Sequence, residues 1–190
     1  MLEKVKQFVK ESFEKGINYS PTQLVHFERT IYWMKILKPD ADEAMQIAAY
    51  AHDIARGFRQ STSVDTFKHR EFNDPEYLKD HQEGGAEIIS KFLKENDYPD
   101  DKINLVYNMV AHHEVGVDEN SNLLMDADSL SFLENNVLHF IDQIPKQGKE
   151  KIQNKIAWMY DRISSEKAKE LAKPYYDKAI EALENYQTNE

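Results

Sequence analysis

The sequence predicts an all-α protein that folds as a single compact multi-helix bundle. Charged residues make up 31% of the 190 residues, and strand-like alternation of apolar and polar residues is scarce, which favours helices with solvated outer faces. The first apolar residues recur at helical spacing: Leu2, Val5, Val9 and Phe13. A chain of this length can bury a sizeable hydrophobic core, so we expect one domain over residues 1–190.

Start signals place the first two helices. The apolar spacing predicts a helix over residues 2–15. The sequence SPTQ predicts the next start, with Ser20 as N-cap, Pro21 at the first helical position and Gln23 completing a capping box. We expect this second helix to end near Pro39.

The sequence DADE predicts a third helix start, with Asp40 as N-cap and Glu43 three residues later. The apolar pattern continues into the stretch AAYAHDIARG, which puts His52 and Asp53 in the last turn of this helix. The polar residues 58–80 then predict a long loop or a short lid, a kind of segment that often belongs to a binding site.

The rest of the chain predicts further helices at about residues 83–94, 101–113 and 126–144. Two more helices, over residues 149–187, are rich in Ala, Lys and Glu. We expect these C-terminal helices to pack on the bundle as an outer layer.

Composition and charge exclude several classes of protein. The formal net charge of −10 disfavours binding along a nucleic-acid backbone, which needs a cationic surface. No residue is cysteine, which excludes disulfides and zinc–thiolate sites and favours a reducing compartment. No apolar run is long enough for a signal core or a membrane span, so we expect a cytoplasmic protein without membrane contact.

Histidine and aspartate residues supply candidates for a metal site. The seven histidines are His26, His52, His69, His81, His112, His113 and His139. Five of them lie at or near predicted helix ends, and Asp53, Asp126 and Asp128 add carboxylates. Imidazole and carboxylate ligands without thiolate suit a catalytic site for Mn, Fe, Ni, Co or Zn better than a structural zinc site.

The neighbouring residues His52 and Asp53 are the least expected part of this set. Successive side chains on a helix point about 100° apart, so the two cannot face the same core wall in the usual way. A metal ion just beyond the helix end would resolve this, because the imidazole can reach it from one side and the carboxylate from the other.

The ordered set His26, His52-Asp53 and Asp128 resembles the HD-domain phosphohydrolase superfamily. That superfamily has a helical fold and binds a divalent metal with a histidine, a His-Asp pair and a later aspartate. The resemblance covers about residues 24–133, which would form the motif core on which the C-terminal helices pack.

Two more histidines look like the additional ligands of the two-metal branches of this superfamily. They are His81 in HQEGGAEII and His112 in AHHEVG. The resemblance implies that the four residues of the ordered set hold a first metal, while His81 and His112 hold a second with the aspartate of the pair bridging. The ligand of each of two pairs stays open: Asp126 could replace Asp128, and His113 could replace or supplement His112.

The resemblance implies metal-dependent hydrolysis of a small phosphate ester, such as a nucleotide or a related metabolite, by a metal-activated water. The cofactor would be one or two divalent transition-metal ions. Asp53 would be central to catalysis, and Arg29 and Arg56 would contact the phosphate. Arg56 stands where nucleotidase and guanosine-tetraphosphate hydrolase branches commonly have a glutamate, which disfavours both of these branches. The substrate is not assigned, because it depends on the geometry of residues 58–80 and of the C-terminal helices.

Two other functions compete with hydrolysis. Oxygenases such as myo-inositol oxygenase use a similar six-ligand set on this fold to hold two irons, and a non-catalytic ligand-binding module would keep a metal for stability alone. Tyr175 and Tyr176 are candidates for a contact in a homodimer.

Overall fold

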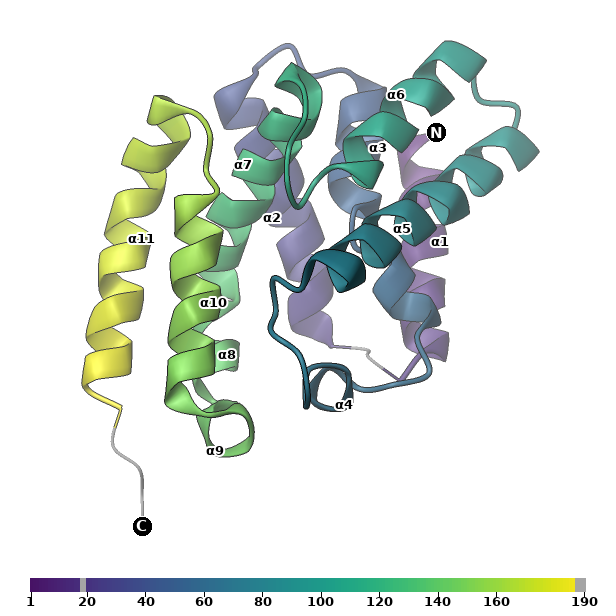
Figure 1. The fold of residues 1–190 in the computed structure, drawn as a ribbon. Helices are drawn as coiled ribbons and strands as arrows, with labels where there is room; N and C mark the ends of the chain where they lie inside the picture. The colour runs from purple at the N-terminus through teal and green to yellow at the C-terminus, as the bar shows by residue number, and fades with distance from the viewer. Residues whose placement is uncertain (18–19, 187–190) are drawn as a thin grey trace.

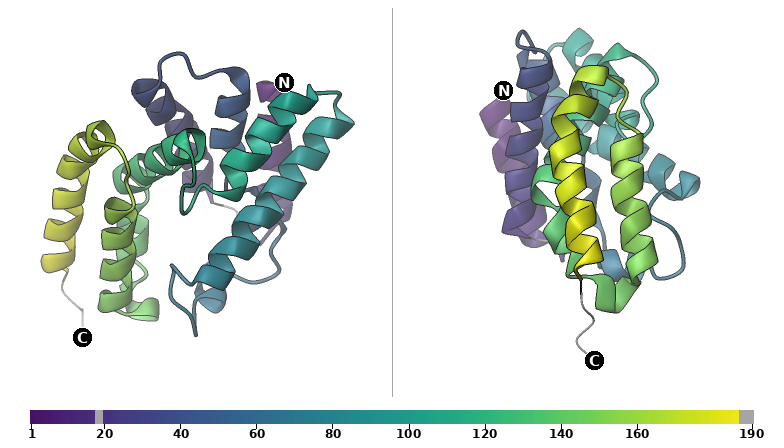
Figure 2. Two further views of the ribbon diagram at one scale, coloured as in Figure 1. Left: turned by 45° about the horizontal axis from the view of Figure 1, so that its top comes forward. Right: turned by 90° about the vertical axis from the view of Figure 1, so that its left-hand side faces the viewer.

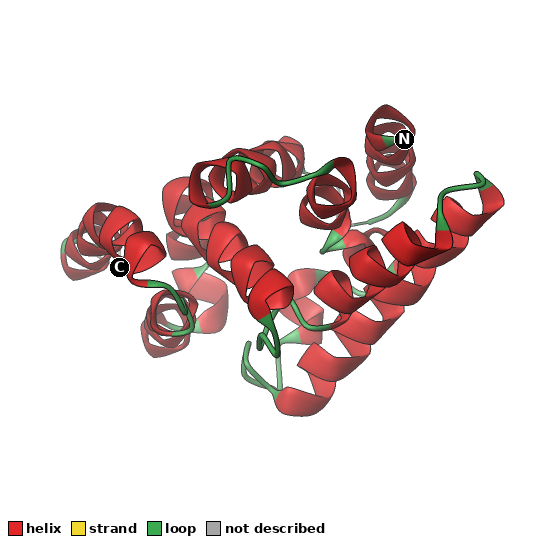
Figure 3. Cartoon of the chain, turned by 90° about the horizontal axis from the view of Figure 1, so that it is seen from above, coloured by secondary structure: helices red, strands yellow, loops and turns green. Residues whose placement is uncertain are grey.

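The computed structural model describes residues 1–17 and 20–186, and every regular element in this part of the chain is helical (Figure 3). The elements are α1 (Leu2–Lys15), α2 (Pro21–Leu37), α3 (Glu43–Ala51), the 3-10 helix η1 (Ile54–Phe58), α4 (Ser63–Thr66), α5 (Pro75–Glu95), α6 (Asp100–Ala111), α7 (Glu119–Asn135), α8 (Val137–Ile141), α9 (Ile144–Gln147), α10 (Lys149–Asp161) and α11 (Glu166–Glu184). The all-α prediction is confirmed. The predicted end of the last helix, at residue 187, and the predicted end of the domain, at residue 190, lie outside the described residues.

The helices form a bundle with an outer layer on one side (Figures 1 and 2). Within the bundle, α2 packs along α7 and α5 packs along α6, while α3 contacts α1, α2, α6 and α7. The outer layer is the pair α10 and α11, which packs against α7 and stands at the left in Figure 1. Because α3 and α7 are central, polar residues on them are brought into the interior.

The third helix starts later than the sequence predicts. Asp42 is its N-cap, because the Asp42 carboxylate accepts a hydrogen bond of 3.0 Å from the Met45 backbone N–H. The predicted cap, Asp40, instead forms an ion pair of 3.0 Å with Lys38. Both aspartates fit the compositional preference for an N-cap, and only the backbone geometry decides between them.

The segment 58–80 is less irregular than the sequence predicts. It contains α4, and its last residues form the first turns of α5. Asp74 caps α5 by accepting a hydrogen bond of 2.8 Å from the Tyr77 N–H, and Pro75 takes the first helical position. His81 therefore lies inside a long helix and is buried.

Helix α7 also begins earlier than predicted. Asp118 and Ser121 form a capping box, so the helix starts at Glu119. It ends at Asn135, and the short helices α8 and α9 follow where the sequence predicts one helix over residues 126–144. The two aspartates of the DAD sequence consequently lie in the middle of α7.

The hydrophobic core extends through the bundle, and α2, α3 and α7 contribute many of its residues. Its fully buried side chains include Phe27, Met34, Ile47, Leu124 and Leu130, and each such burial stabilises the fold by about 1.5–3 kcal/mol. Within residues 1–17 and 20–186, none of the helices combines the length and the hydropathy that a membrane span needs. Against this apolar background, a group of buried histidines and carboxylates stands out.

Candidate metal centre

His52 and Asp53 lie at the bend between α3 and η1. Helix α3 ends at Ala51, so the two residues follow its last turn instead of lying in it. They are only 1% and 2% exposed. Gly85 of α5 allows a close approach to this bend, because a Cβ there would lie 3.3 Å from the His52 carbonyl oxygen. The bend thus buries an imidazole and a carboxylate side by side.

Three histidines of the cluster are held through their Nδ1 atoms. In His52 and His113, the Nδ1–H donates to the backbone carbonyl three residues earlier, at 2.9 and 2.7 Å. His26 Nδ1 bonds to the Ser131 hydroxyl at 2.8 Å. Hydrogen bonds of this kind fix the ring and leave the Nε2 lone pair for a metal. The Nε2 atoms of His52 and His113 are buried without a hydrogen-bond partner among the described residues.

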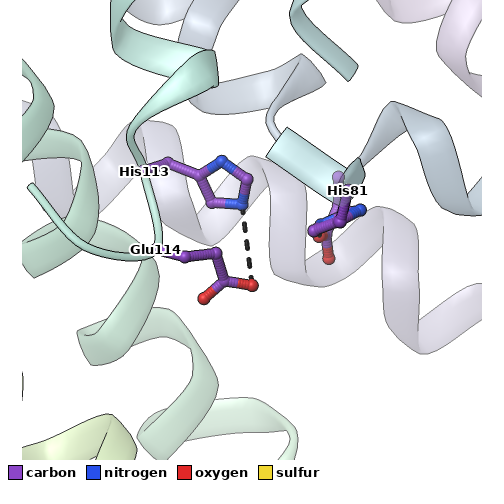
Figure 4. A group of neighbouring side chains, drawn as sticks. His81, His113 and Glu114 are labelled. Carbon is purple, nitrogen blue, oxygen red and sulfur yellow. Dashed lines mark hydrogen bonds and ion pairs between the residues drawn. The ribbon is translucent and has the colours of Figure 1, made fainter. Parts of the chain in front are cut away.

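The ligand atoms form two groups that share Asp53. One group is His26, His52 and Asp53, and the other is Asp53, His81, His113 and Glu114. Within each group the ligand atoms lie within 4.8 Å of one another. Figure 4 shows His113 and Glu114 on the loop after α6 and His81 on α5, with His113 Nε2 3.8 Å from Glu114 Oε1. These residue types at these separations can hold a divalent transition metal.

Asp128 adjoins the first group, and Asp126 does not. Asp128 Oδ1 lies 3.1 Å from His26 Nε2 and 3.4 Å from His52 Nε2. The Asp126 carboxylate accepts hydrogen bonds from the backbone N–H groups of Ser164 and Ser165, at 2.6 and 3.0 Å. Residues two apart on a helix point roughly 200° apart, so one aspartate faces the cluster and the other faces the start of α11.

The structure brings His113 into the cluster in place of His112. His113 is fully buried, and its ring centroid lies 5.1 Å from that of His52 and 5.4 Å from that of His81. His112 follows the last turn of α6, is partly exposed and belongs to neither group of ligand atoms. The buried residues Val106 and Val110 lie seven and three positions before His113. Helical spacing was therefore the signal that could have selected it.

The carboxylates dominate the electrostatics of the first group. Burial alone would lower the pKa of His52, but the charges of Asp128 and Asp53 outweigh it and raise the pKa to about 9. Burial alone would raise the pKa of Asp53, but the charges of Arg56 and His52 hold it well below its usual range. The two carboxylates are therefore ionised at neutral pH, and they favour a cation at this position.

The second group has neutral imidazoles. Burial, with the charges of His52 and His81, lowers the pKa of His113 to about 4 against the opposing effect of Glu114. Burial also lowers the pKa of His81. For Glu114, burial would raise the pKa, but the guanidinium of Arg162 outweighs it and lowers the pKa to about 2. Neutral imidazole and ionised carboxylate are the protonation states that bind metals.

A cavity of about 240 Å³ adjoins the cluster, with Glu114 and Arg56 in its wall. Arg59 and Lys155 add positive charge to the lining. The aromatic side chains of the lining are Phe13, Phe67, Phe72, Tyr77 and Phe140. Arg56 Nε lies 3.0 Å from Asp53 Oδ1, so at least one cation of the lining is next to the candidate ligands. This combination of charge and aromatic surface suits a small anion with a planar or apolar group.

Gln23 contacts the site, whereas Arg29 lies elsewhere. Gln23 Nε2 donates to Asp53 Oδ2 at 3.2 Å and lines the cavity, and it does not complete the predicted capping box. Both nitrogens of the Arg29 fork donate to Glu134 at 2.8 Å. Arg29 is not among the described residues of the cavity wall. Of the two predicted phosphate contacts, Arg56 is the one that the structure places beside the cluster.

The outer layer supplies two cations that the sequence reasoning missed. Arg162, at the end of α10, donates to Asp128 and Glu114, and Lys155 lines the cavity. Burial lowers the pKa of Lys155 to about 8, against the opposing charge of Glu114. Ile152 and Ile156 belong to the same buried stripe of α10 as Lys155. A lysine at an apolar position of a helix was the available signal.

Comparison with known proteins places the chain in a family. The model of the family described as domain of unknown function DUF4202 matches residues 6–183. The chain belongs to this family. No curated protein matches the chain.

A solved structure shows the same fold. The crystal structure of a predicted HD superfamily hydrolase from an uncultured Thermotogales bacterium superposes with a TM-score of 0.62 at 19% sequence identity. The match covers 96% of this chain and 89% of that chain. The chain therefore has an HD-domain-like all-α fold, as the resemblance implies, and its buried His/Asp/Glu cluster has the composition of a metal site.

Proposed function

We propose that this protein is a metal-dependent phosphohydrolase that cleaves a small phosphate ester. The observation that carries the proposal is the contact between the two parts of the site. A buried cluster of imidazole and carboxylate groups opens onto a cavity whose wall contains Arg56, Arg59 and Lys155. The cluster fits a metal, and the cavity fits an anion.

The donor set of the cluster fits one or two divalent transition metals. His26, His52, Asp53 and Asp128 would hold the first ion. His81, His113 and Glu114 would hold the second, with Asp53 as the shared ligand. The Nε2 atom of His113 supports this assignment, because it is buried without a hydrogen-bond partner among the described residues and a metal ion satisfies such a lone pair.

When bound, such ions lower the pKa of water towards neutrality and offset charge on phosphoryl oxygens. The residues of the chain have their own tasks. Gln23 and Arg56 orient the Asp53 carboxylate, with Gln23 Nε2 at 3.2 Å and Arg56 Nε at 3.0 Å. Arg56 also offers charge to the substrate phosphate from the cavity wall. The aromatic walls exclude water from the remainder of the substrate.

The test is hydrolysis by the purified protein loaded with Mn²⁺, Fe²⁺, Ni²⁺, Co²⁺ or Zn²⁺ in turn. Release of inorganic phosphate is measured on a panel of nucleotides, sugar phosphates and p-nitrophenyl phosphate. We expect Asp53→Asn to lower phosphate release at least about a hundredfold and to lower bound metal. Asp40→Asn is the matched control, because the Asp40 side chain is 81% exposed.

Two results would contradict the proposal. Metal-loaded protein that releases no phosphate from any member of the panel would count against hydrolysis. If that protein held two irons and consumed oxygen with a polyol or phosphonate, the oxygenase function would replace it. Equal activity of Asp53→Asn and the wild type would exclude the cluster as the site.

A further inference from the structure

Lys155 is a buried ammonium group that lies among aromatic rings. The residue is 7% exposed. Its Nζ lies 4.4 Å from the ring centroid of Trp158, 5.5 Å from that of Phe132 and 5.9 Å from that of Phe72. Within residues 1–17 and 20–186, no hydrogen bond or ion pair joins Nζ to another residue. Burying an ammonium without a hydrogen-bonded anion is costly, because ring contacts replace only part of its hydration.

The other cations of the site are engaged with site residues. Arg56 pairs with Asp53 at 3.0 Å. Arg59 donates to the Tyr77 hydroxyl. Arg162 donates to two carboxylates of the cluster. Each of these three cations also contacts a polar group of the protein. Lys155 Nζ pairs with no carboxylate among the described residues, so it can bond fully to a molecule that enters the cavity.

The position of Lys155 defines where such a molecule would lie. Lys155, Glu114 and Arg56 line the same cavity. The Lys155 side chain comes from α10, while Glu114 follows α6 and Arg56 belongs to η1. An anion in the cavity is therefore bordered by the cluster through Glu114 and Arg56, and by the outer layer through Lys155.

We infer that Lys155 binds the phosphate group of the substrate through Nζ and makes the outer layer part of the substrate site. This inference rests on the proposed function and adds a binding residue from outside the motif core. An ammonium group has three donors, which can bond phosphoryl oxygens with charge assistance. The surrounding rings exclude water, so a hydrogen bond here is stronger than at an exposed lysine.

The test is calorimetric titration of inorganic phosphate into the Mn²⁺-loaded protein and its variants. We expect Lys155→Met to weaken phosphate affinity by at least about tenfold, because the variant loses a charge-assisted hydrogen bond to the phosphate. Lys155→Arg should lose less affinity than Lys155→Met, because the guanidinium keeps the charge and can also donate to phosphoryl oxygens. Lys149→Met is the matched control, because Lys149 lies on the same helix and is exposed.

A second readout separates binding from packing. Methionine keeps an unbranched apolar side chain among the rings, so Lys155→Met should keep its bound metal and unfold at a Tm no lower than that of the wild type. Loss of metal or a large fall in Tm in this variant would assign Lys155 to the fold and overturn the inference.

The remaining outcomes distinguish the inference from the proposed function. If Lys155→Met keeps its metal and binds phosphate as tightly as the wild type does, the inference is wrong and the hydrolase proposal stands. If the metal-loaded wild type neither binds phosphate nor releases it from esters, the proposed function is wrong, and the inference falls with it.

Discussion

The inner cluster and the outer layer contribute different chemistry to one site. The cluster comes from α2, the bend between α3 and η1, α5, α7 and the loop after α6, and its imidazoles and carboxylates suit a metal cation. The outer layer comes from α10 and α11, and it offers Lys155 and Arg162, which suit anions. The outer layer therefore contributes charged groups next to the cluster in addition to packing against α7.

Arg162 tests whether the layer neutralises the cluster. We expect Arg162→Met to destabilise the metal-free protein by about 3–5 kcal/mol, because two buried carboxylates would lose their cation. The measurement is denaturant unfolding without and with metal, and added metal should restore part of the loss. Arg70→Met is the control, since Arg70 lies at the surface in a 4.0 Å pair and its loss should change stability by less than about 0.5 kcal/mol. Equal stability of the Arg162→Met variant and the wild type would show that the outer layer does not neutralise the cluster.

The stability of the protein relative to the Lys155→Met variant should depend on pH. The pKa of Lys155 is about 8 in the folded state and near the ordinary value of 10.5 when unfolded, so between these values the unfolded chain binds more protons. Stability relative to Lys155→Met should therefore rise as pH increases from 8 to 10.5, by up to about 3 kcal/mol. Below pH 8 the difference should be constant. Unfolding of both proteins across this range is the measurement, and a difference that does not change with pH would contradict a buried ammonium.

Substitution of the adjacent residues His112 and His113 tests which of the two is a metal ligand. We expect His113→Ala to weaken metal affinity by about a hundredfold, or about 2.7 kcal/mol, because its Nε2 belongs to the second group of ligand atoms. His112→Ala is the natural control and should bind metal as the wild type does. Elemental analysis after dialysis, with competition against a chelator, measures both. The reverse ranking would return the ligand role to His112.

The two predicted phosphate contacts should behave differently, and Arg29 should give the smallest effect on stability. We expect Arg29→Gln to lower stability by about 1 kcal/mol or less, because its pair with Glu134 is partly exposed. Phosphate affinity should not change in this variant. Arg56→Gln should weaken phosphate binding, since Arg56 lines the cavity. Titration of phosphate into both variants separates the two roles, and equal weakening would show that Arg29 also acts at the site.

Much of the fold could be predicted because local sequence patterns determine where its helices begin and end. Apolar spacing gives α1 at its observed bounds, and Ser20 and Pro21 mark the start of α2. The cap of α3 was missed because DADE contains two aspartates that fit the same role. A one-residue or two-residue ambiguity of this kind is settled by backbone geometry, which composition does not encode.

The candidate site was harder to predict, because tertiary contacts decide which of its residues reach the cluster. Helical spacing distinguishes His113 from His112, but it does not show that Asp126 binds the start of α11 while Asp128 meets the histidines. The role of Gln23 depends on a 3.2 Å contact across 30 residues of sequence. Lys155 and Arg162 come from a layer outside the resembled region, and only the packing of that layer on α7 brings their charges to the cluster.

Helix α7 joins the two parts of the molecule through residues only two positions apart. Asp128 faces the histidines, while Asp126 accepts hydrogen bonds from Ser164 and Ser165, just after Arg162. Thermodynamic linkage makes such an arrangement reciprocal, so a ligand that is held more tightly when the layer is docked must also hold the layer more tightly, by the same free energy. Hydrogen exchange at the Ser164 and Ser165 amides would then report the occupancy of a cavity that neither serine lines.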